Sequence, residues 1–197
     1  MKVGVLALQG DVPEHLAALR PLLRRSEIVV VRGPSDLDSV GALCMPGGES
    51  TTIARLIEQS GLWAPLAERL AEGFPVLATC AGLILLAREL APGASGKDPS
   101  TFGVLDVRVR RNDYGAQRES CEVPVSVEGM EGPPFPGVFI RSPRILAVGP
   151  QAVPIAWREG EVVGVRAGGL WGLTFHPELA RDPRVHRLFL ASIGRRA

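Results

Sequence analysis

Apolar residues in the first half of the chain form short, nearly continuous runs. These runs occupy residues 3–8, 28–31, 42–45 and 76–78. Continuous apolar runs of this length are typical of strands that are buried on both faces, as the strands of a parallel sheet are. The pattern therefore predicts a set of parallel strands in the N-terminal half of the fold.

Between these runs, apolar residues recur at helical spacing. This periodicity predicts helices near residues 12–24, 51–59 and 63–72, and a mostly buried helix over 83–90. Strands that alternate with helices indicate an α/β domain that carries helices on both faces of its sheet.

The second half of the chain has a different pattern. Apolar and polar residues alternate in 104–110 and 121–127, which is typical of strands with one face in water. Glycine and proline are frequent in 92–103 and 129–137, which we predict to be loops, and apolar periodicity predicts a final helix near 183–193. Further short strands are predicted at residues 138–140, 145–148, 153–157, 162–166 and 170–175. Residues 1–197 are thus expected to form one mixed α/β domain with an antiparallel extension.

Composition narrows the class of protein. A chain of 197 residues corresponds to about one domain. Its 22 basic and 21 acidic residues give a net charge of +1, which argues against nucleic acid or a membrane surface as the main partner. The 3 cysteines are widely spaced, so a disulfide framework and a structural metal site are not expected. No apolar leader precedes the first run, and no run approaches the ~18 residues of a membrane span. We expect a soluble, cytoplasmic protein.

A cysteine stands where a predicted buried strand meets a predicted helix. Cys80 is followed by Ala81 and Gly82, and small neighbours are what a nucleophile elbow at the carboxyl end of a sheet requires. The helix N-terminus would stabilise a thiolate, and the Ala81 N–H would be free to face an oxyanion. The alternative is a structural cysteine buried at a strand end.

A histidine and a carboxylate follow the last predicted strand. In the sequence His176-Pro177-Glu178 the two side chains stand two positions apart in an extended segment and can face the same side. Glu178 could then orient the imidazole while His176 accepts a thiol proton. The alternative is a loop histidine in a cap or turn. We expect His15 at the surface or an interface, and His186 solvated on the last helix.

A pair of glycines follows the apolar run 42–45. Gly47 and Gly48 allow the backbone to approach a ligand or to turn an N–H inward, and Ser50 or Thr51 can cap the next helix. The alternative is an ordinary strand-to-helix turn. The segment is not a phosphate loop, because the required spacing and lysine are absent.

Other candidate groups are less specific. Cys44 and Cys121 lie inside predicted strands and are interpreted as structural residues. The arginines of residues 108–111 are interpreted as a solvated face, from which one could bind a carboxylate, and Arg141 is a similar case.

Six segments together resemble a known family over nearly the whole chain. They are GVLALQGDVPEH (4–15), LCMPGGESTT (43–52), TCAGLILLA (79–87), RRNDYG (110–115), VFIRSP (138–143) and FHPEL (175–179). These segments are similar to the glutaminase subunit of pyridoxal 5′-phosphate synthase, a class I (triad) glutamine amidotransferase. One departure is Ala78, where many members of the class carry glycine, and alanine is nearly as small.

The resemblance implies a three-layer α/β fold, with a mixed and mostly parallel sheet, that hydrolyses L-glutamine to L-glutamate and ammonia. By matching motif positions, Cys80 would be the nucleophile, His176 the general base and acid, and Glu178 the residue that orients it. Gly48 and Ala81 would supply the N–H groups of the oxyanion hole. The glutamine pocket would be lined by Gly48, Glu49, Ser50, Arg111, Ile140 and Arg141.

Members of this family pass ammonia to a separate, barrel-shaped synthase subunit. This chain would then need no cofactor and no metal of its own. Gln9 follows the first strand and should lie at the same sheet edge as Cys80, where a docked partner could contact it. Three other readings stay open: a stand-alone cysteine hydrolase such as a peptidase or γ-glutamyl hydrolase, the glutaminase of a synthase in histidine or purine synthesis, and a non-catalytic binding module.

Overall fold

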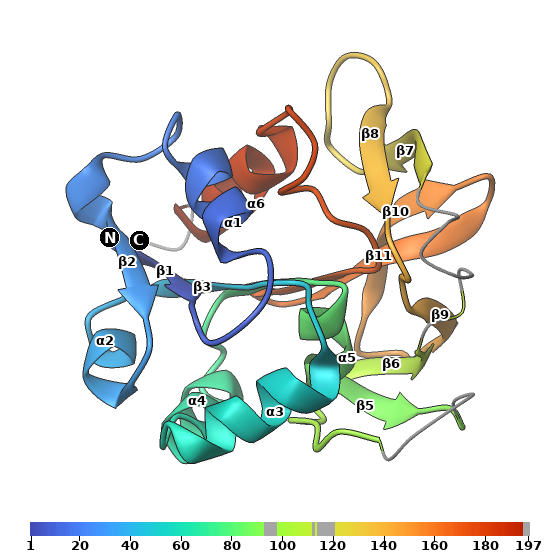
Figure 1. Cartoon of the computed structure of the whole chain (residues 1–197). Coiled ribbons are helices and arrows are strands. Elements are labelled where there is room, and N and C mark those ends of the chain that lie inside the picture. The colour runs from blue at the N-terminus through green and yellow to red at the C-terminus, as the bar shows by residue number, and fades with distance from the viewer. Residues whose placement is uncertain (93–97, 112, 114–120, 195–197) are drawn as a thin grey trace.

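The computed structural model describes residues 1–92, 98–111, 113 and 121–194 (Figure 1). The helices are α1 (Val12–Leu19), the 3₁₀-helix η1 (Arg25–Glu27), α2 (Pro34–Asp38), α3 (Ser50–Gln59), α4 (Trp63–Ala71), α5 (Ala81–Leu86) and α6 (Arg184–Gly194). The strands are β1 (Val3–Leu6), β2 (Ile28–Val31), β3 (Ala42–Met45), β4 (Val76–Thr79), β5 (Ala87–Leu90), β6 (Leu105–Arg110), β7 (Cys121–Val127), β8 (Phe135–Phe139), β9 (Arg144–Val148), β10 (Val153–Arg158), β11 (Glu161–Ala167) and β12 (Leu170–Leu173).

A large mixed sheet forms the centre of the molecule. Within the described residues its strand order is β2-β1-β3-β4-β12-β11-β10-β7-β8. The pairs from β2 to β12 are parallel, and those from β12 to β8 are antiparallel. A smaller sheet has the order β5-β6-β9. The predicted parallel half and its antiparallel extension are therefore both confirmed.

Helices cover both faces of the parallel strands. Helices α1 and α6 lie on one face, and α2, α3 and α4 lie on the other (Figure 1). The apolar run of β1 serves both layers, because successive side chains of a strand point to opposite faces. Val3 packs in one apolar cluster with Leu19 of α1 and Phe189 of α6, whereas Leu6 packs in the other with Ile53 of α3. The α/β architecture predicted from these runs is confirmed. Among the described residues, no helix is both long and apolar enough to cross a membrane.

Some predicted elements differ from the structure. The helix expected over 83–90 ends at Leu86, and 87–90 is the strand β5, which pairs with β6 through Ala87 and Leu105. That pairing overrides the helical periodicity of the segment. Helix α1 ends at Leu19, short of the predicted residue 24, because Pro21 has no N–H to continue the helix. Part of the predicted loop 129–137 belongs to β8, and α2 was not predicted.

Candidate active site

Cys80 occupies a sharp turn between β4 and α5. Its φ of 48° and ψ of −101° are unusual for a residue with a side chain, and such strain is concentrated at functional sites. The Cys80 N–H donates to the Leu173 carbonyl of β12 at 2.9 Å, which ties the turn to the neighbouring strand. A Cβ on Gly82 would lie 2.5 Å from the Met45 carbonyl, so only glycine lets α5 begin this close to β3. The elbow predicted from the small residues is present.

The His176–Glu178 pair lies beside this turn. The His176 N–H donates to the Val138 carbonyl at 2.8 Å, which fixes the segment after β12 against β8. Its ring Nδ1 lies 2.9 Å from Glu178 Oε1, and both side chains are buried. His176 Nε2 has no hydrogen-bond partner among the described residues and is available for the thiol proton. Cys80 and His176 line the same pocket.

Burial and neighbouring charges act in opposite directions on this pair. Burial lowers the pKa of His176, but interactions with Asp11, Cys80 and Glu178 outweigh it and raise the pKa well above its ordinary value. Burial raises the pKa of Glu178, but electrostatic interaction with His15 and the hydrogen bond to His176 lower it to about 2. Glu178 is therefore an ionised acceptor at neutral pH, as an orienting carboxylate must be.

Asp11 is a site residue that the sequence analysis missed. Its Oδ2 lies 3.1 Å from His176 Nδ1, and its side chain, 31% exposed, lines the pocket. Asp11 immediately precedes α1 and follows β1, so it stands at the carboxyl edge of the parallel strands. An acidic residue after the first parallel strand was the signal that could have found it.

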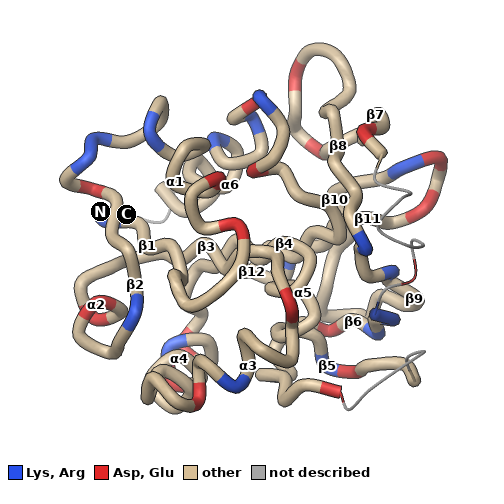
Figure 2. The backbone as a smooth tube through the Cα atoms, viewed as in Figure 1, with Lys and Arg blue, Asp and Glu red and all other residues tan. Residues whose placement is uncertain are grey.

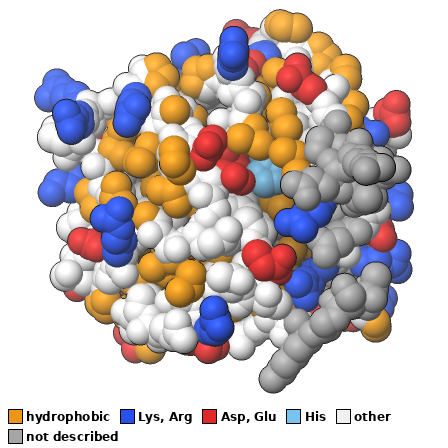
Figure 3. All heavy atoms as spheres, viewed as in Figure 1, with side chains coloured by type: hydrophobic (Ala, Val, Ile, Leu, Met, Phe, Trp, Pro, Cys, Tyr) orange, Lys and Arg blue, Asp and Glu red, His pale blue; other side chains and the backbone are white. Residues whose placement is uncertain are grey.

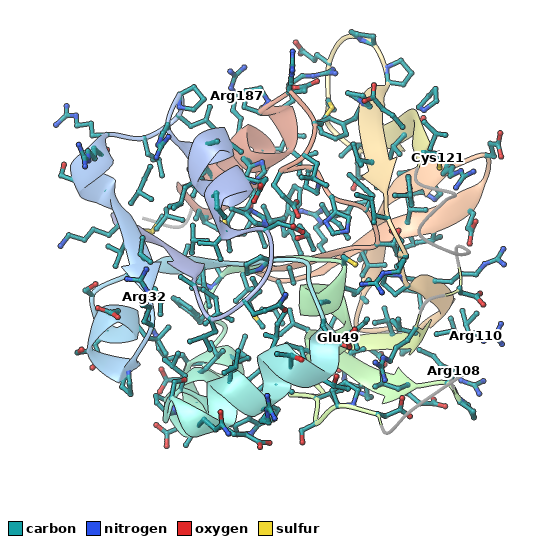
Figure 4. All side chains as sticks on the ribbon, in the orientation of Figure 1. Arg32, Glu49, Arg108, Arg110, Cys121 and Arg187 are labelled. Atoms are coloured by element: carbon teal, nitrogen blue, oxygen red, sulfur yellow. The ribbon has the colours of Figure 1, made fainter. Side chains whose placement is uncertain are left out.

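The glycine pair after β3 faces the same pocket. The Gly47 carbonyl accepts a hydrogen bond from the Asp11 N–H at 3.2 Å, so the Gly48 N–H of this trans peptide points the opposite way. Glu49, which is labelled at the start of α3 in Figure 4, caps that helix and donates its own N–H to Gln9 Oε1 at 2.9 Å. Gln9 is thus bound to the loop that carries Gly48, and it does not line the pocket.

All six predicted glutamine-binding residues line one pocket. Arg111 lies 3.4 Å from Glu49 and 3.3 Å from Asp98, with a nearly buried side chain, and so it is not part of a solvated face. Arg141 has a φ of 43°, a second unusual backbone conformation at this site. The pocket is lined by Asp11, Gly48, Glu49, Ser50, Cys80, Ile84, Arg111, Ile140, Arg141, His176 and Leu179. Ala81, the first residue of α5, immediately follows Cys80 in the chain and is not part of this lining.

The charges around the pocket are of both signs. Acidic residues lie on the loops after β1 and β3, and basic residues lie on the side of β6 and β9 (Figure 2). On the face shown in Figure 3, a histidine side chain is visible between acidic and basic side chains. Such a site can hold the ammonium and the carboxylate of an amino acid at opposite sides.

Other predicted positions fall away from the pocket. Arg108 and Arg110 extend outward from β6, and Cys121 begins β7 (Figure 4). Cys44 is fully buried in β3, as expected for a structural cysteine. Residues 112, 114 and 115 of the RRNDYG segment lie outside the described residues.

The expectations for the two remaining histidines are wrong. His15 and His186 are both 0% exposed, whereas we expected a surface or interface residue and a solvated one. Helices α1 and α6 pack on the same face of the sheet, and His15 Nδ1 lies 3.2 Å from His186 Nε2 between them. His15 is one helical turn before the buried Leu19, which was the signal for its inward orientation.

The fold and the site together indicate the class of glutamine amidotransferases. Parallel strands, a cysteine elbow at their carboxyl edge and a histidine–glutamate pair in the segment after the adjacent strand β12 are all present. The chain belongs to the SNO glutamine amidotransferase family, whose model matches residues 5–195.

Relatives of nearly the same length are known. A Pyrococcus horikoshii protein named pyridoxal 5′-phosphate synthase subunit PdxT is 46% identical over 98% of this chain and 100% of its own length. A protein of the same name from Mycolicibacterium vanbaalenii is 49% identical over 98% of both chains. A solved structure described as a glutamine amidotransferase superposes with a TM-score of 0.88 at 42% identity, covering 98% of this chain and 100% of the other.

Proposed function

We propose that this chain is the glutaminase subunit of a pyridoxal 5′-phosphate synthase. It hydrolyses L-glutamine to L-glutamate and ammonia with Cys80 as nucleophile, His176 as general base and acid, and Glu178 as the residue that orients His176. The observation that carries this proposal is the Cys80 elbow opening into the same pocket as the His176–Glu178 pair. Relatives named as subunits of that synthase, 46% and 49% identical to this chain, support the pathway, and the glutamine amidotransferase family supports the substrate.

The first half of the reaction forms a thioester. The Cys80 proton passes to His176, and the thiolate attacks the side-chain amide carbon of glutamine. The N–H groups of Ala81 and Gly48 hold the resulting oxyanion, and each such donor is worth on the order of 3 kcal/mol. The imidazolium then protonates the amide nitrogen, the C–N bond breaks, and ammonia leaves a γ-glutamyl thioester.

The second half releases glutamate. His176 takes a proton from water as the water attacks the thioester carbon, and the C–S bond breaks to free glutamate and regenerate the Cys80 thiolate. Glu178 stays ionised throughout, because its pKa of about 2 lies far below neutral pH. Its role is to keep Nδ1 of the ring protonated, so that Nε2 faces the reacting atoms.

The pocket provides groups for both ends of the free amino acid. Arg111 and Arg141 are suited to the α-carboxylate, and Glu49 to the α-ammonium group. Ser50 and Ile140 complete the wall of the pocket. Ammonia is delivered to the barrel-shaped synthase subunit, which docks at the edge where Gln9 lies, and we place the complex in the cytoplasm. This chain uses no cofactor or metal of its own in this scheme.

The test compares two nitrogen sources. Cys80→Ala, in complex with the synthase subunit, should lose glutamine-dependent synthesis of pyridoxal 5′-phosphate and keep synthesis from added ammonium salt. Cys121→Ser is the matched control, since Cys121 lies outside the pocket, and it should retain both activities. Glutamine use at the wild-type rate by Cys80→Ala would place the nucleophile elsewhere.

The same experiment addresses the other readings. A stand-alone cysteine hydrolase would act fully without the synthase subunit, and a non-catalytic module would release no glutamate in its presence. A glutaminase for histidine or purine synthesis would not support formation of pyridoxal 5′-phosphate. The complete Cys80, His176 and Glu178 set and the names of the relatives favour the proposed subunit.

A further inference from the structure

The chain has 3 histidines, and all of them are buried in one cluster. His15 lies between His186 and Thr79. Its Nδ1 is 3.2 Å from His186 Nε2, and its Nε2 is 3.2 Å from Thr79 Oγ1. Thr79 Oγ1 donates to Glu178 Oε1 at 3.1 Å, and the same oxygen contacts His176. A continuous path of polar contacts therefore runs from α6, through α1 and β4, to the carboxylate beside the pocket.

The direction of these hydrogen bonds follows from Glu178. An ionised carboxylate can only accept, so the single proton of the Thr79 hydroxyl points to Oε1. The Thr79 oxygen must then accept from His15, which requires a proton on His15 Nε2. A neutral imidazole protonated at Nε2 has its lone pair at Nδ1, and this lone pair can accept only from His186 Nε2–H.

His15 and His186 are both suited to the neutral state that this path of hydrogen bonds requires. Burial lowers the pKa of His15, and the neighbouring His176 lowers it further. The carboxylates of Glu178, Asp11 and Glu14 act in the opposite direction but do not outweigh burial. Burial and the neighbouring His15 together lower the pKa of His186 to about 3. The path then leaves a lone pair at His186 Nδ1, and not an N–H, without a partner among the described residues.

Glu178 depends on these contacts because its second oxygen is poorly held. Oε2 is buried and has no hydrogen bond among the described residues, and its neighbour is His15 Nε2 at 3.6 Å. A buried carboxylate without adequate donors is costly and tends to move or to become protonated. Thr79 supplies the side-chain donor from outside the His176–Glu178 pair.

We propose that Thr79 and His15 are positioning residues of this site: His15 directs the Thr79 hydroxyl to Glu178, and Thr79 holds Glu178 where it orients His176. This assignment rests on the proposed glutaminase function and adds residues that do not touch the substrate pocket. Thr79 and His15 are both absent from its lining.

A matched pair of variants at Thr79 tests the role in turnover. Thr79→Val keeps the shape of the side chain and removes the hydroxyl, whereas Thr79→Ser keeps the hydroxyl. In complex with the synthase subunit, Thr79→Val should lower kcat for glutamine roughly tenfold or more, with KM unchanged. Thr79→Ser should restore most of kcat. Wild-type kcat in Thr79→Val, or equal losses in both variants, would overturn the proposal.

Nitrogen NMR on the wild-type chain tests the path without any assay of activity. The 3 histidines allow complete assignment. His15 and His186 should both be neutral and protonated at Nε2 across roughly pH 6 to 8. The His176 Nδ1–H resonance should shift in Thr79→Val and not in Thr79→Ser. A His15 protonated at Nδ1, or an unchanged His176 resonance in Thr79→Val, would refute the assignment. If the wild-type complex released no glutamate from glutamine, the proposed function would be wrong. The same resonances would still show whether the hydrogen bonds from His186 through His15 and Thr79 to Glu178 have the proposed direction.

Discussion

The Nδ1 nitrogen of His176 lies 3.1 Å from Oδ2 of Asp11, a contact nearly as short as the one between His176 and Glu178 in the proposed triad. Glu178 approaches the same nitrogen at 2.9 Å from the buried side, whereas Asp11 approaches it from the pocket. One ring N–H thus faces two carboxylates. Both negative charges favour the imidazolium and therefore raise the pKa of His176, and the interaction of His176 with Cys80 raises it further.

Asp11→Asn should therefore lower the pKa of His176. The substitution keeps the size of the side chain and removes one of the two carboxylates, so the imidazolium should lose its proton at a lower pH than in the wild type. The measurement is an NMR titration of the His176 ring. Glu58→Gln is the control, since it removes an exposed charge on α3 and should leave the titration unchanged. An identical titration in Asp11→Asn would show that Asp11 is not in contact with the ring in solution.

The ionised state of Glu178 should appear in the dependence of stability on pH. Its pKa is lowered from 4.5 to about 2 in the folded chain, so folding favours the ionised form. This contribution is fully present above pH ~4.5 and is lost as the pH falls toward about 2. The lost stabilisation is on the order of 3 kcal/mol. Urea unfolding at a series of pH values should show a shallower decline across this window in Glu178→Gln than in the wild type, and parallel curves would contradict the lowered pKa.

Cys80 should be the cysteine that reacts with a glutamine-mimicking electrophile. Burial raises the pKa of the Cys44 thiol, with a further contribution from Glu178, so Cys44 is neither accessible nor ionised. Cys121 is half-buried in β7, away from the pocket. Mass spectrometry should find one label per chain at Cys80, unchanged in Cys121→Ser. Stoichiometric labelling of Cys80→Ala would be incompatible with this assignment.

Local patterns were sufficient to predict the parallel strands and the elbow. In β1 and β3, continuous apolar runs reflect strands covered on both faces, and this requirement is visible in each run by itself. The elbow at Cys80 could be predicted because the turn needs small neighbours in the adjacent sequence positions. His176 and Glu178 stand close in sequence, so their mutual contact was also predictable.

Contacts between distant segments could not be predicted in this way. Asp11 meets His176 because the loops after β1 and β12 converge at one edge of the sheet. His15 and His186 are buried because α1 and α6 share a face, and neither helix reveals this by itself. The strand β5 has a helical pattern of apolar residues and is determined by its pairing with β6. In each case tertiary packing decides what local periodicity leaves open.

Gly47→Ala should abolish most of the glutaminase activity without unfolding the chain. A Cβ on Gly47 would lie 2.3 Å from His176 Cε1 and 2.7 Å from Nδ1, so the ring must move away. A misplacement of about 1 Å in a catalytic group can lower the rate about 100-fold, and we expect a loss of that order in kcat. Gly33→Ala is the matched control, because a Cβ there meets nothing within 4 Å. Equal activity of the two variants would mean that the imidazole does not occupy the position described.

Docking of the synthase subunit should switch on this glutaminase through Gln9. The Gln9 Oε1 accepts the Glu49 N–H at 2.9 Å and lies 2.6 Å from where a Gly48 Cβ would be, so it contacts the loop that carries the proposed oxyanion donor. A partner that contacts Gln9 can therefore favour the competent orientation of Gly48 by differential binding. Glutamate release should be slow for the chain alone and at least about tenfold faster with saturating synthase subunit.

Gln9→Ala should lose this activation, whereas Gln59→Ala, which removes an exposed side chain at the end of α3, should retain it. The measurement is glutamate release at equal concentrations of this chain, with and without the synthase subunit. Binding of the partner is determined separately, so that a lost switch is distinguished from lost docking. Equal rates with and without the partner in the wild type would eliminate the switch while leaving the triad in place. Full activation of Gln9→Ala would show that the signal reaches Gly48 by another contact.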